Sequence, residues 1–376
     1  MSDVNGRAYV IGAGPAGLAA AAMLSRAGVP ATVLERAPVV AASWRTHYDR
    51  LHLHTTRRLS ALPGLPIPRS YGRWVARDDL VRYLEGYVER HHLDVRTGVE
   101  VERIDRHDGP DRWELSTTAG DRLAASTVVV ATGYNHTPFV PDWPGREGFT
   151  GRLSHAKDYR DPGPYAGCDV LVVGVGNTGA EIAADLAGGG AGRVRLAVRT
   201  PPHIVRRDVA GWPAQGTGIL VHHLPSAAVD VAARLMARLS IPDLSRQGLP
   251  RPTDGLYTRV RRDGAIPVQD VGIIDAVQTG KVEPVASVVG FDGAEVHLSD
   301  GTTITPDAVI AATGYRRGLQ GMVGHLGILD PHGLPIARGG TAAAPGLFFV
   351  GYLLTLRGAL RDIALEARRV GRAAAR

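Results

Sequence analysis

Two glycine-rich segments of the sequence have the residue types and spacing of dinucleotide-binding turns. In the first, Gly12, Gly14 and Gly17 directly follow the apolar run 8–11 and open an alanine-rich stretch. In such a turn the first glycine bends the chain, the second lets the backbone approach a pyrophosphate, and the third lets the helix pack on the strand. Glu35 ends the next apolar run and can accept hydrogen bonds from an adenosine ribose. We therefore predict a dinucleotide site here, with its phosphates at the N-terminus of a helix.

The second segment repeats this spacing after the apolar run 170–173 and consists of Gly174, Gly176, Asn177, Thr178 and Gly179. No acid ends the following run, 194–198; Arg199 and Thr200 stand there instead. Because an arginine suits a 2′-phosphate, this site favours NADP over NAD. Two dinucleotide sites in one chain indicate a flavoprotein reduced by NADPH, with FAD in the N-terminal site.

The elements that position these residues alternate between apolar strands and helices, which is typical of an α/β protein with parallel sheets. Strand, helix and strand are expected at 8–11, 16–27 and 31–34, and again at 170–173, 178–187 and 194–198. Further strands are expected at 308–312 and 346–351. We predict two Rossmann-like domains. A discontinuous FAD-binding domain comprises 1–160 and 306–376, and an inserted NADPH-binding domain comprises 161–305 with a cap insert at about 201–265.

Composition excludes several other classes of protein. With 44% hydrophobic and 21% charged residues, the chain is expected to be globular. Its net charge of +6 comes without a long basic run, which favours anionic cofactors over nucleic acid. Cys168 is the only cysteine, so no CxxC pair exists and a reducing, cytoplasmic location is expected. No signal peptide, membrane span or metal-ligand spacing is predicted, and 226–239 reads as an amphipathic surface or lid helix.

Between the two glycine motifs, a pattern formed by Phe149, Gly151, His155 and Tyr159 resembles the fingerprint FxGxxxHxxx(F/Y) of flavin-containing monooxygenases. Thr132 and Gly133, like Thr313 and Gly314, stand in segments similar to the ATG-type turns of that family, where the chain crosses between domains. Trp44 and the stretches 48–54, 82–87, 268–272 and 346–351 are similar to those of YUCCA enzymes. The likeness extends from about Tyr9 to about Leu365.

The resemblance implies roles for further residues. Trp44, Arg45 and Gly351 are expected near FAD, and His54 is a candidate for contact with the flavin or its oxygen adduct. His155 is expected to organise the linker between the domains rather than to transfer protons. The chain departs from YUCCA enzymes at Thr55-Thr56, where those have Leu-Pro, and in the loop 352–358, which should lie near the flavin. Tyr159 replaces the Trp of most Baeyer–Villiger relatives.

The resemblance also implies the reaction. NADPH reduces FAD, O2 forms a C4a-(hydro)peroxyflavin, and one oxygen atom passes to a small organic substrate. Oxidative decarboxylation of a 2-oxo acid such as an aryl pyruvate is the leading expectation, with N- or S-oxygenation and Baeyer–Villiger oxidation as alternatives. Outside this class, an NADPH-dependent reductase and a nucleotide-sensing protein remain open. The lone Cys168 argues against a dithiol reductase.

Overall fold

The computed structural model describes residues 7–109 and 112–375 and divides the chain into two compact units. Unit 1 comprises the described residues of 1–46, 51–137 and 315–376; unit 2 comprises 47–50 and 138–314. Residues 138–160 and 306–314, which the sequence analysis assigned to the FAD-binding domain, belong to unit 2. The assignment of one nucleotide to each unit remains a prediction.

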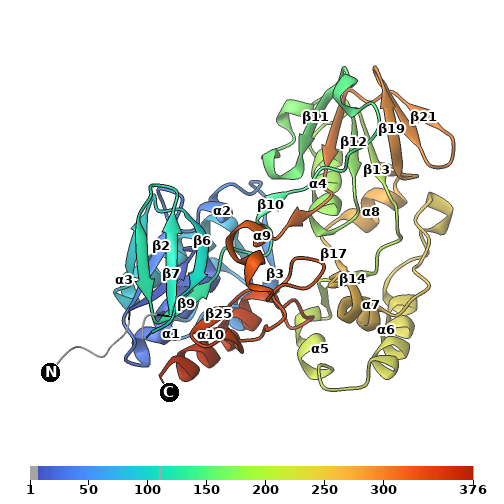
Figure 1. Ribbon diagram of the computed structural model, residues 1–376. Helices are drawn as coiled ribbons and strands as arrows, with labels where there is room; N and C mark the ends of the chain where they lie inside the picture. The colour runs from blue at the N-terminus through green and yellow to red at the C-terminus, as the bar shows by residue number, and fades with distance from the viewer. Residues whose placement is uncertain (1–6, 110–111, 376) are drawn as a thin grey trace. The chain divides into compact units, whose positions relative to one another are not determined.

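Unit 1 is built on a parallel sheet that needs both ends of the chain. Its strand order is β24-β25-β9-β1-β2-β5, and only the pairing of β24 with β25 is antiparallel. The strands are β1 (Ala8–Ile11), β2 (Ala31–Glu35), β5 (Asp94–Thr97), β9 (Thr127–Val130), β24 (Ala342–Ala344) and β25 (Leu347–Phe349). β25 therefore returns from near the C-terminus to complete a sheet that begins at Ala8 (Figure 1).

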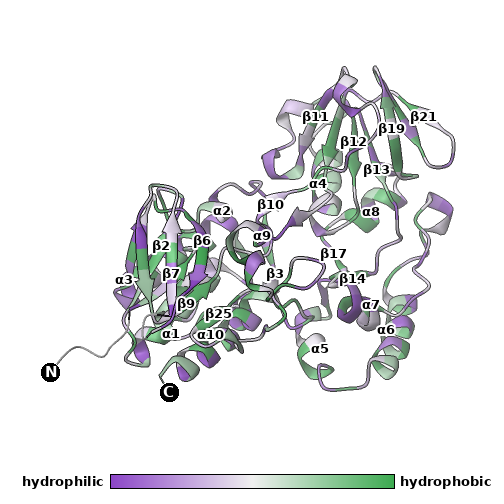
Figure 2. Ribbon diagram, viewed as in Figure 1, coloured by the Kyte–Doolittle hydropathy of each residue, from purple (hydrophilic) through white to green (hydrophobic). Residues whose placement is uncertain are grey.

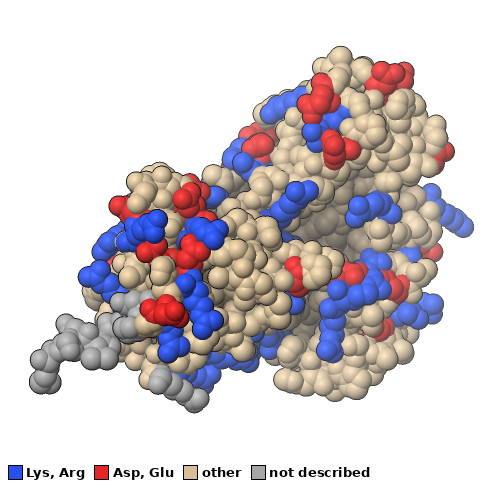
Figure 3. All heavy atoms as spheres, viewed as in Figure 1, with Lys and Arg blue, Asp and Glu red and all other residues tan. Residues whose placement is uncertain are grey.

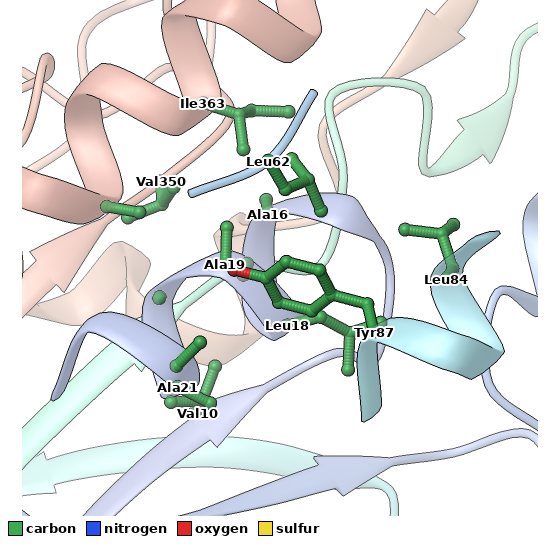
Figure 4. Packing of buried hydrophobic residues seen from close by; sticks show 14 of the residues in the cluster. Val10, Ala16, Leu18, Ala19, Ala21, Leu62, Leu84, Tyr87, Val350 and Ile363 are labelled. Atoms are coloured by element: carbon green, nitrogen blue, oxygen red, sulfur yellow. The ribbon is translucent and has the colours of Figure 1, made fainter. Parts of the chain in front are cut away.

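The helices of unit 1 are α1 (Pro15–Arg26), α2 (Ala42–Arg45), α3 (Arg77–His91), α9 (Gln320–Val323) and α10 (Ala359–Ala374). Small residues let α10 approach α1 closely: a Cβ on Gly371 would lie 2.6 Å from the Met23 carbonyl oxygen. Ile363 of α10 lies close to Leu62 and to Ala16 of α1 in the apolar core (Figure 4). Burial of this alanine-rich surface fixes α1, and with it the first glycine motif, on the sheet.

Unit 1 also contains shorter strands. They are β3 (His52–Thr56), β4 (Trp74–Ala76), β6 (Val101–Arg106), β7 (Trp113–Thr117), β8 (Arg122–Ala125) and β23 (Tyr315–Arg316). β3 pairs antiparallel with β4, and β6-β7-β8 form an antiparallel sheet.

Unit 2 repeats this plan with a wholly parallel five-stranded sheet of order β11-β22-β12-β13-β18. Its strands are β11 (Arg152–His155), β12 (Asp169–Val173), β13 (Arg193–Ala197), β18 (Glu283–Val285) and β22 (Ala308–Ala311). The helices α4 (Asn177–Gly188) and α8 (Ile273–Gln278) accompany it, and β10 (Thr137–Pro138) lies at the 137/138 boundary between the units. An antiparallel sheet of β19 (Val288–Asp292), β20 (Glu295–Leu298) and β21 (Thr303–Ile304) follows. β12 is largely apolar, as buried parallel strands are (Figure 2), whereas β13 includes the buried Arg195, which pairs with Asp169 at the start of β12.

The insert of unit 2 leaves and returns through two paired parallel strands, β14 (Ile204–Arg206) and β17 (Val268–Asp270). Between them lie β15 (Asp208–Val209), β16 (Trp212–Pro213), α5 (Ala214–Leu220), α6 (Ser226–Ser240) and α7 (Leu256–Asp263). The buried Asp230 carboxylate on α6 accepts hydrogen bonds from the Tyr257 amide at 2.6 Å and the Thr258 hydroxyl at 2.5 Å, which joins α6 to the start of α7. The helix expected at 226–239 is confirmed.

The structure confirms the predicted α/β class and the two Rossmann-like units, the first of them discontinuous. Among the helices in the described part of the chain, none combines the length and apolarity that crossing a membrane requires.

Candidate active site

The first glycine motif has the backbone geometry that its sequence predicts. Gly12 has φ +104°, and a Cβ there would lie 2.7 Å from the Ala131 carbonyl oxygen. A Cβ on Gly17 would lie 1.8 Å from the Gly12 carbonyl oxygen, so only glycine fits. A Cβ on Gly14, by contrast, would meet no atom within 4 Å. The middle glycine therefore borders open space, where a pyrophosphate could approach the backbone.

Glu35, at the end of β2, holds the same turn. One carboxylate oxygen accepts from the Ala13 amide at 2.7 Å and the other from the Ala37 amide at 2.9 Å. A carboxylate oxygen can accept more than one hydrogen bond, so a ribose hydroxyl can still be received. The N-terminus of α1 has no side-chain cap, which leaves it suited to an anion. These residues fit the adenosine and pyrophosphate parts of FAD.

The second glycine motif reproduces this geometry in unit 2. Gly174 has φ +107° and a Cβ there would lie 2.6 Å from the Ala312 carbonyl oxygen; on Gly179 it would lie 1.9 Å from the Gly174 oxygen. Gly176 again borders open space. Asn177 joins α4 to β17 and to the residue before it, because its side chain accepts from the Gln269 amide at 2.7 Å and donates to the Pro267 carbonyl at 3.1 Å.

Arg199 and Thr200, which are expected to contact the 2′-phosphate of NADPH, lie just beyond the end of β13. Arg199 and Thr200 are exposed, whereas Thr178 in the first turn of α4 is half-buried. Arg199 makes no hydrogen bond or ion pair with any residue that the structure describes. Its guanidinium is therefore available to a 2′-phosphate, and the residues present fit NADPH.

Each glycine motif packs against one of the two ATG-type turns. Gly12 lies against the Ala131 carbonyl of the first turn, and Gly174 lies against the Ala312 carbonyl of the second. Thr132 in the first turn exchanges a 2.8 Å hydrogen bond with the buried Tyr352 hydroxyl, whose pKa burial raises to about 12. Thr313 in the second donates to the Phe139 carbonyl. Gly133 and Gly314 have φ of +96° and +87°, so both turns use the left-handed region that favours glycine.

The first half of the fingerprint holds β11 in place. Phe149 meets Phe291 edge-on at 5.2 Å between ring centroids. A Cβ on Gly151 would lie 2.9 Å from the Asp307 carbonyl oxygen, next to the point where the Arg152 amide bonds that oxygen. These contacts are structural.

The second half of the fingerprint is buried and hydrogen-bonded. His155 Nδ1 accepts from the Lys157 amide at 3.0 Å, so its proton is on Nε2, which donates to the Gly314 carbonyl at 3.1 Å. Burial lowers the pKa of His155, which keeps the ring neutral. The Tyr159 hydroxyl donates to Asp185 at 2.7 Å. These contacts support the interpretation that His155 organises the linker, because Gly314 is the last residue before the chain crosses to unit 1.

A contact of α4 with residues 47–50 was not predicted. The Tyr48 hydroxyl donates to the buried Glu181 at 2.9 Å, and burial together with this carboxylate raises the pKa of Tyr48. Arg50 pairs with Asp185 at 3.2 Å. This excursion belongs to unit 2. The only sequence signal was the likeness of 48–54 to YUCCA enzymes.

Three further predicted site residues lie in unit 1, two of them consecutive in α2. Trp44 packs at the edge of the core, and Arg45 pairs with Glu85 of α3 and donates to the Val40 carbonyl at 3.1 Å. His54 is half-buried in β3. Arg45 thus uses some of its five N–H donors within unit 1, and its contact with FAD stays a prediction.

Two buried acids of α10 hold nearby backbone and loop residues: Glu366 bonds Gly339 and Gly351, and Asp362 bonds the loop 352–358. The sequence analysis predicted neither contact. Glu366 accepts from the Gly351 amide at 2.7 Å and the Gly339 amide at 3.1 Å. Burial raises the pKa of Glu366 to about 7. Asp362 accepts from the Thr355 hydroxyl at 2.6 Å and pairs with Arg357 at 2.7 Å. The available signal was two acids four positions apart in an otherwise apolar and basic helix.

A hollow of about 430 Å³ in unit 1 is lined by Arg57, Arg58 and Arg69. Arg57 is fixed by donating to the Gly72 and Ile67 carbonyls, both at 3.0 Å. Arg58 and Arg69 are exposed and form no hydrogen bond or ion pair within the described part of the chain. Three guanidinium groups around one hollow suit an oxyanion.

Comparison with known proteins identifies relatives of the whole chain. A family model described as pyridine nucleotide-disulphide oxidoreductase matches residues 9–212. The indole-3-pyruvate monooxygenase YUCCA1 of Oryza sativa subsp. japonica is 36% identical, covering 94% of this chain and 87% of that protein. The probable indole-3-pyruvate monooxygenase YUCCA3 of Arabidopsis thaliana is 32% identical, covering 93% and 82%.

Solved structures agree with these relatives. A flavin-containing monooxygenase from Stenotrophomonas maltophilia superposes with a TM-score of 0.73 at 26% identity, covering 98% of both chains. An open cyclohexanone monooxygenase superposes with a TM-score of 0.72 at 20% identity, covering 98% and 88%, which shows the shared fold alone. The chain therefore belongs to the FAD- and NADPH-dependent flavin monooxygenases, together with the YUCCA-type enzymes and within the wider pyridine nucleotide-disulphide oxidoreductase group.

Proposed function

We propose that this monooxygenase oxidatively decarboxylates an aryl 2-oxo acid such as indole-3-pyruvate. The observation that carries the proposal is the 36% identity, over 94% of the chain, to an indole-3-pyruvate monooxygenase. In the overall reaction the 2-oxo acid, O2, NADPH and a proton give the acid one carbon shorter, CO2, NADP+ and water. The electrophilic ketone carbon of the substrate makes a protein nucleophile unnecessary.

The arginine hollow supports an acidic substrate. A 2-oxo acid carries a carboxylate, and guanidinium groups bind carboxylates through paired hydrogen bonds. Arg57 is held in place by two carbonyls, and Arg58 and Arg69 retain their donors. A neutral amine, sulfide or ketone would gain nothing from this hollow, so it favours decarboxylation over the alternative oxygenations.

The same proposal assigns roles to the two motifs. Gly12, Gly14, Gly17 and Glu35 hold FAD, and Gly174, Gly176, Gly179 and Arg199 hold NADPH. Bound FAD supplies hydride acceptance and oxygen activation; the chain supplies position and electrostatics. His54 is the candidate for a hydrogen bond at the flavin. The reaction partners are one small molecule and O2, and the predicted cytoplasmic location remains a prediction that the lone Cys168 supports.

The test is conversion of indole-3-pyruvate with NADPH under 18O2, followed by mass detection of indole-3-acetate. We expect one labelled oxygen in the new carboxylate. Catalase must be present, because free H2O2 decarboxylates 2-oxo acids without an enzyme. Loss of the product on adding catalase, or oxygen transfer to an amine or sulfide instead, would contradict the proposal while leaving the family assignment intact.

A further inference from the structure

Exposed apolar side chains of the described residues gather in the insert of unit 2. Of the large apolar side chains that the structure leaves exposed, three lie elsewhere: Val39, Val289 and Ile336. The other eight lie between residues 209 and 239: Val209, Trp212, Leu220, Leu224, Val231, Leu235, Met236 and Leu239. Clustering of this kind marks a surface that binds something, because scattered apolar residues would be ordinary.

The helix α6 is apolar on its outer face. Val229 and Asp230 face inward and are buried. Val231, Leu235 and Leu239, spaced by four residues, are 68%, 59% and 77% exposed. Residues so spaced share one side of a helix. We call these three residues, together with Met236, the outer face of α6; the ribbon of α6 includes green, hydrophobic segments in Figure 2.

Arginines border this outer face. Arg234 and Arg238 lie beside it on α6, exposed, and neither forms a hydrogen bond or ion pair with any residue in the ranges 7–109 and 112–375. The insert, 201–265, contains nine arginines and five aspartates, a net charge of +4 out of +6 for the whole chain. Charged side chains show on the space-filling surface above a largely uncharged area where α5 and the lower part of α6 lie (Figure 3).

The positive charge beside the outer face of α6 distinguishes between two possible partners, a second copy of the chain and an anionic lipid surface. In a symmetric contact between two copies, the same patch meets itself, so Arg234 and Arg238 of both copies would come together. The only acid on α6 is Asp230, which is buried and bound to α7. An anionic lipid surface instead offers phosphates to the arginines and an acyl boundary to the leucines.

We propose that the outer face of α6, bordered by Arg234 and Arg238, binds the surface of an anionic lipid bilayer. Leu235 and Leu239 enter the boundary between headgroups and acyl chains, and the arginines bind lipid phosphates at its edge. No residue of this surface belongs to either glycine motif, so the inference does not depend on the proposed substrate.

The experiment is co-sedimentation of the full-length flavoprotein with vesicles of phosphatidylglycerol and phosphatidylcholine. We expect binding that weakens in high salt and on vesicles of phosphatidylcholine alone. Partial burial of each leucine corresponds to about a tenfold gain in partitioning, so the double variant L235S/L239S should bind roughly a hundredfold more weakly. R234Q/R238Q should bind roughly thirtyfold more weakly.

The matched control is Ile336→Ser, an apolar residue of unit 1 that is 65% exposed, which should bind as the parent does. Flavin content verifies the fold of each variant. Absence of parent binding to the anionic vesicles in low salt would overturn the proposal. So would equal binding of L235S/L239S, or a dimer in sedimentation equilibrium that this variant alone dissociates.

Discussion

The two glycine motifs have nearly the same backbone but different surroundings. A Cβ at the first glycine would lie 2.7 Å from a carbonyl oxygen in unit 1 and 2.6 Å in unit 2; at the third the distances are 1.8 Å and 1.9 Å. The following strand ends in Glu35 in one unit and leads to Arg199 in the other. The shared backbone geometry fits a dinucleotide in both units, and we propose that the side chain at or after the strand end distinguishes which dinucleotide each unit takes.

The motif helices also differ in what holds them. α1 packs against α10, whose Glu366 bonds the Gly351 amide. α4 is held by Tyr48 through Glu181 and by its own Asn177 through the backbone near β17. If these differences matter, changes in unit 1 should affect flavin binding and changes in unit 2 should affect the use of NADPH.

Gly17→Ala should have the largest effect, because its Cβ would overlap the Gly12 carbonyl oxygen. We expect a loss of about 3 kcal/mol or more in stability and a purified protein without flavin colour. Gly179→Ala introduces the same clash in unit 2 and should leave flavin bound while abolishing reduction by NADPH. Flavin absorbance and thermal unfolding measure both outcomes.

The control for Gly17→Ala is Gly14→Ala, which borders open space and should keep the fold. A Gly17→Ala protein as yellow and as stable as its parent would show that the two turns are not equivalent. Loss of flavin from the Gly179→Ala protein would show that flavin binding also depends on the glycine motif of unit 2.

Glu366 should make the stability of unit 1 fall with rising pH. Its pKa is raised from 4.5 to about 7, so the folded protein keeps a proton that the unfolded chain releases. The stabilisation is present below pH about 4.5 and is lost as the pH rises through about 7. The change amounts to about 3 kcal/mol. Chemical denaturation of the parent and of Glu366→Gln across this range measures it.

Glu366→Gln should remove this pH dependence, since the amide does not titrate. Other groups titrate equally in both proteins, so the difference between the two unfolding free energies isolates Glu366. A difference that stays constant with pH would refute a raised pKa at this position.

Arg199→Ala should raise KM for NADPH roughly ten- to hundredfold, because a hydrogen bond to a charged group contributes about 1.5–3 kcal/mol. KM for NADH should hardly change. Arg193→Ala, at the other end of β13, is the matched control and should change neither. Equal losses with both nucleotides would show that Arg199 does not distinguish them.

His54→Ala should have the smallest effect. NADPH oxidation should continue while the H2O2 released per turnover rises roughly two- to tenfold, the range expected for one neutral hydrogen bond. His52→Ala, exposed on the same strand, serves as the control. Unchanged coupling of NADPH oxidation to substrate oxygenation would assign His54 a structural role.

Local patterns predicted much of the fold. The expected strand 8–11 is β1, and the expected helix 178–187 lies within α4, because apolar periodicity and glycine turns are properties of short segments. The site was harder to predict. Asp185, which bonds Tyr159, is 26 positions from it, and Glu181 is 133 positions from Tyr48. Local sequence patterns do not predict such contacts, nor the hydrogen bonds of the Asn177 side chain to Pro267 and Gln269.

The strand β25 and the helix α10 have a consequence for biosynthesis. A ribosome releases residues in order, so the whole of unit 2 emerges before the last strand of unit 1 exists. Until these two elements follow, β9 lacks its partner β25 and α1 lacks the helix α10 that packs on it, so unit 1 must remain a partly formed intermediate. A premature stop before residue 347 would thus leave the second unit whole and the first incomplete. If unit 1 holds FAD as we propose, nascent chains should acquire FAD only at the end of translation.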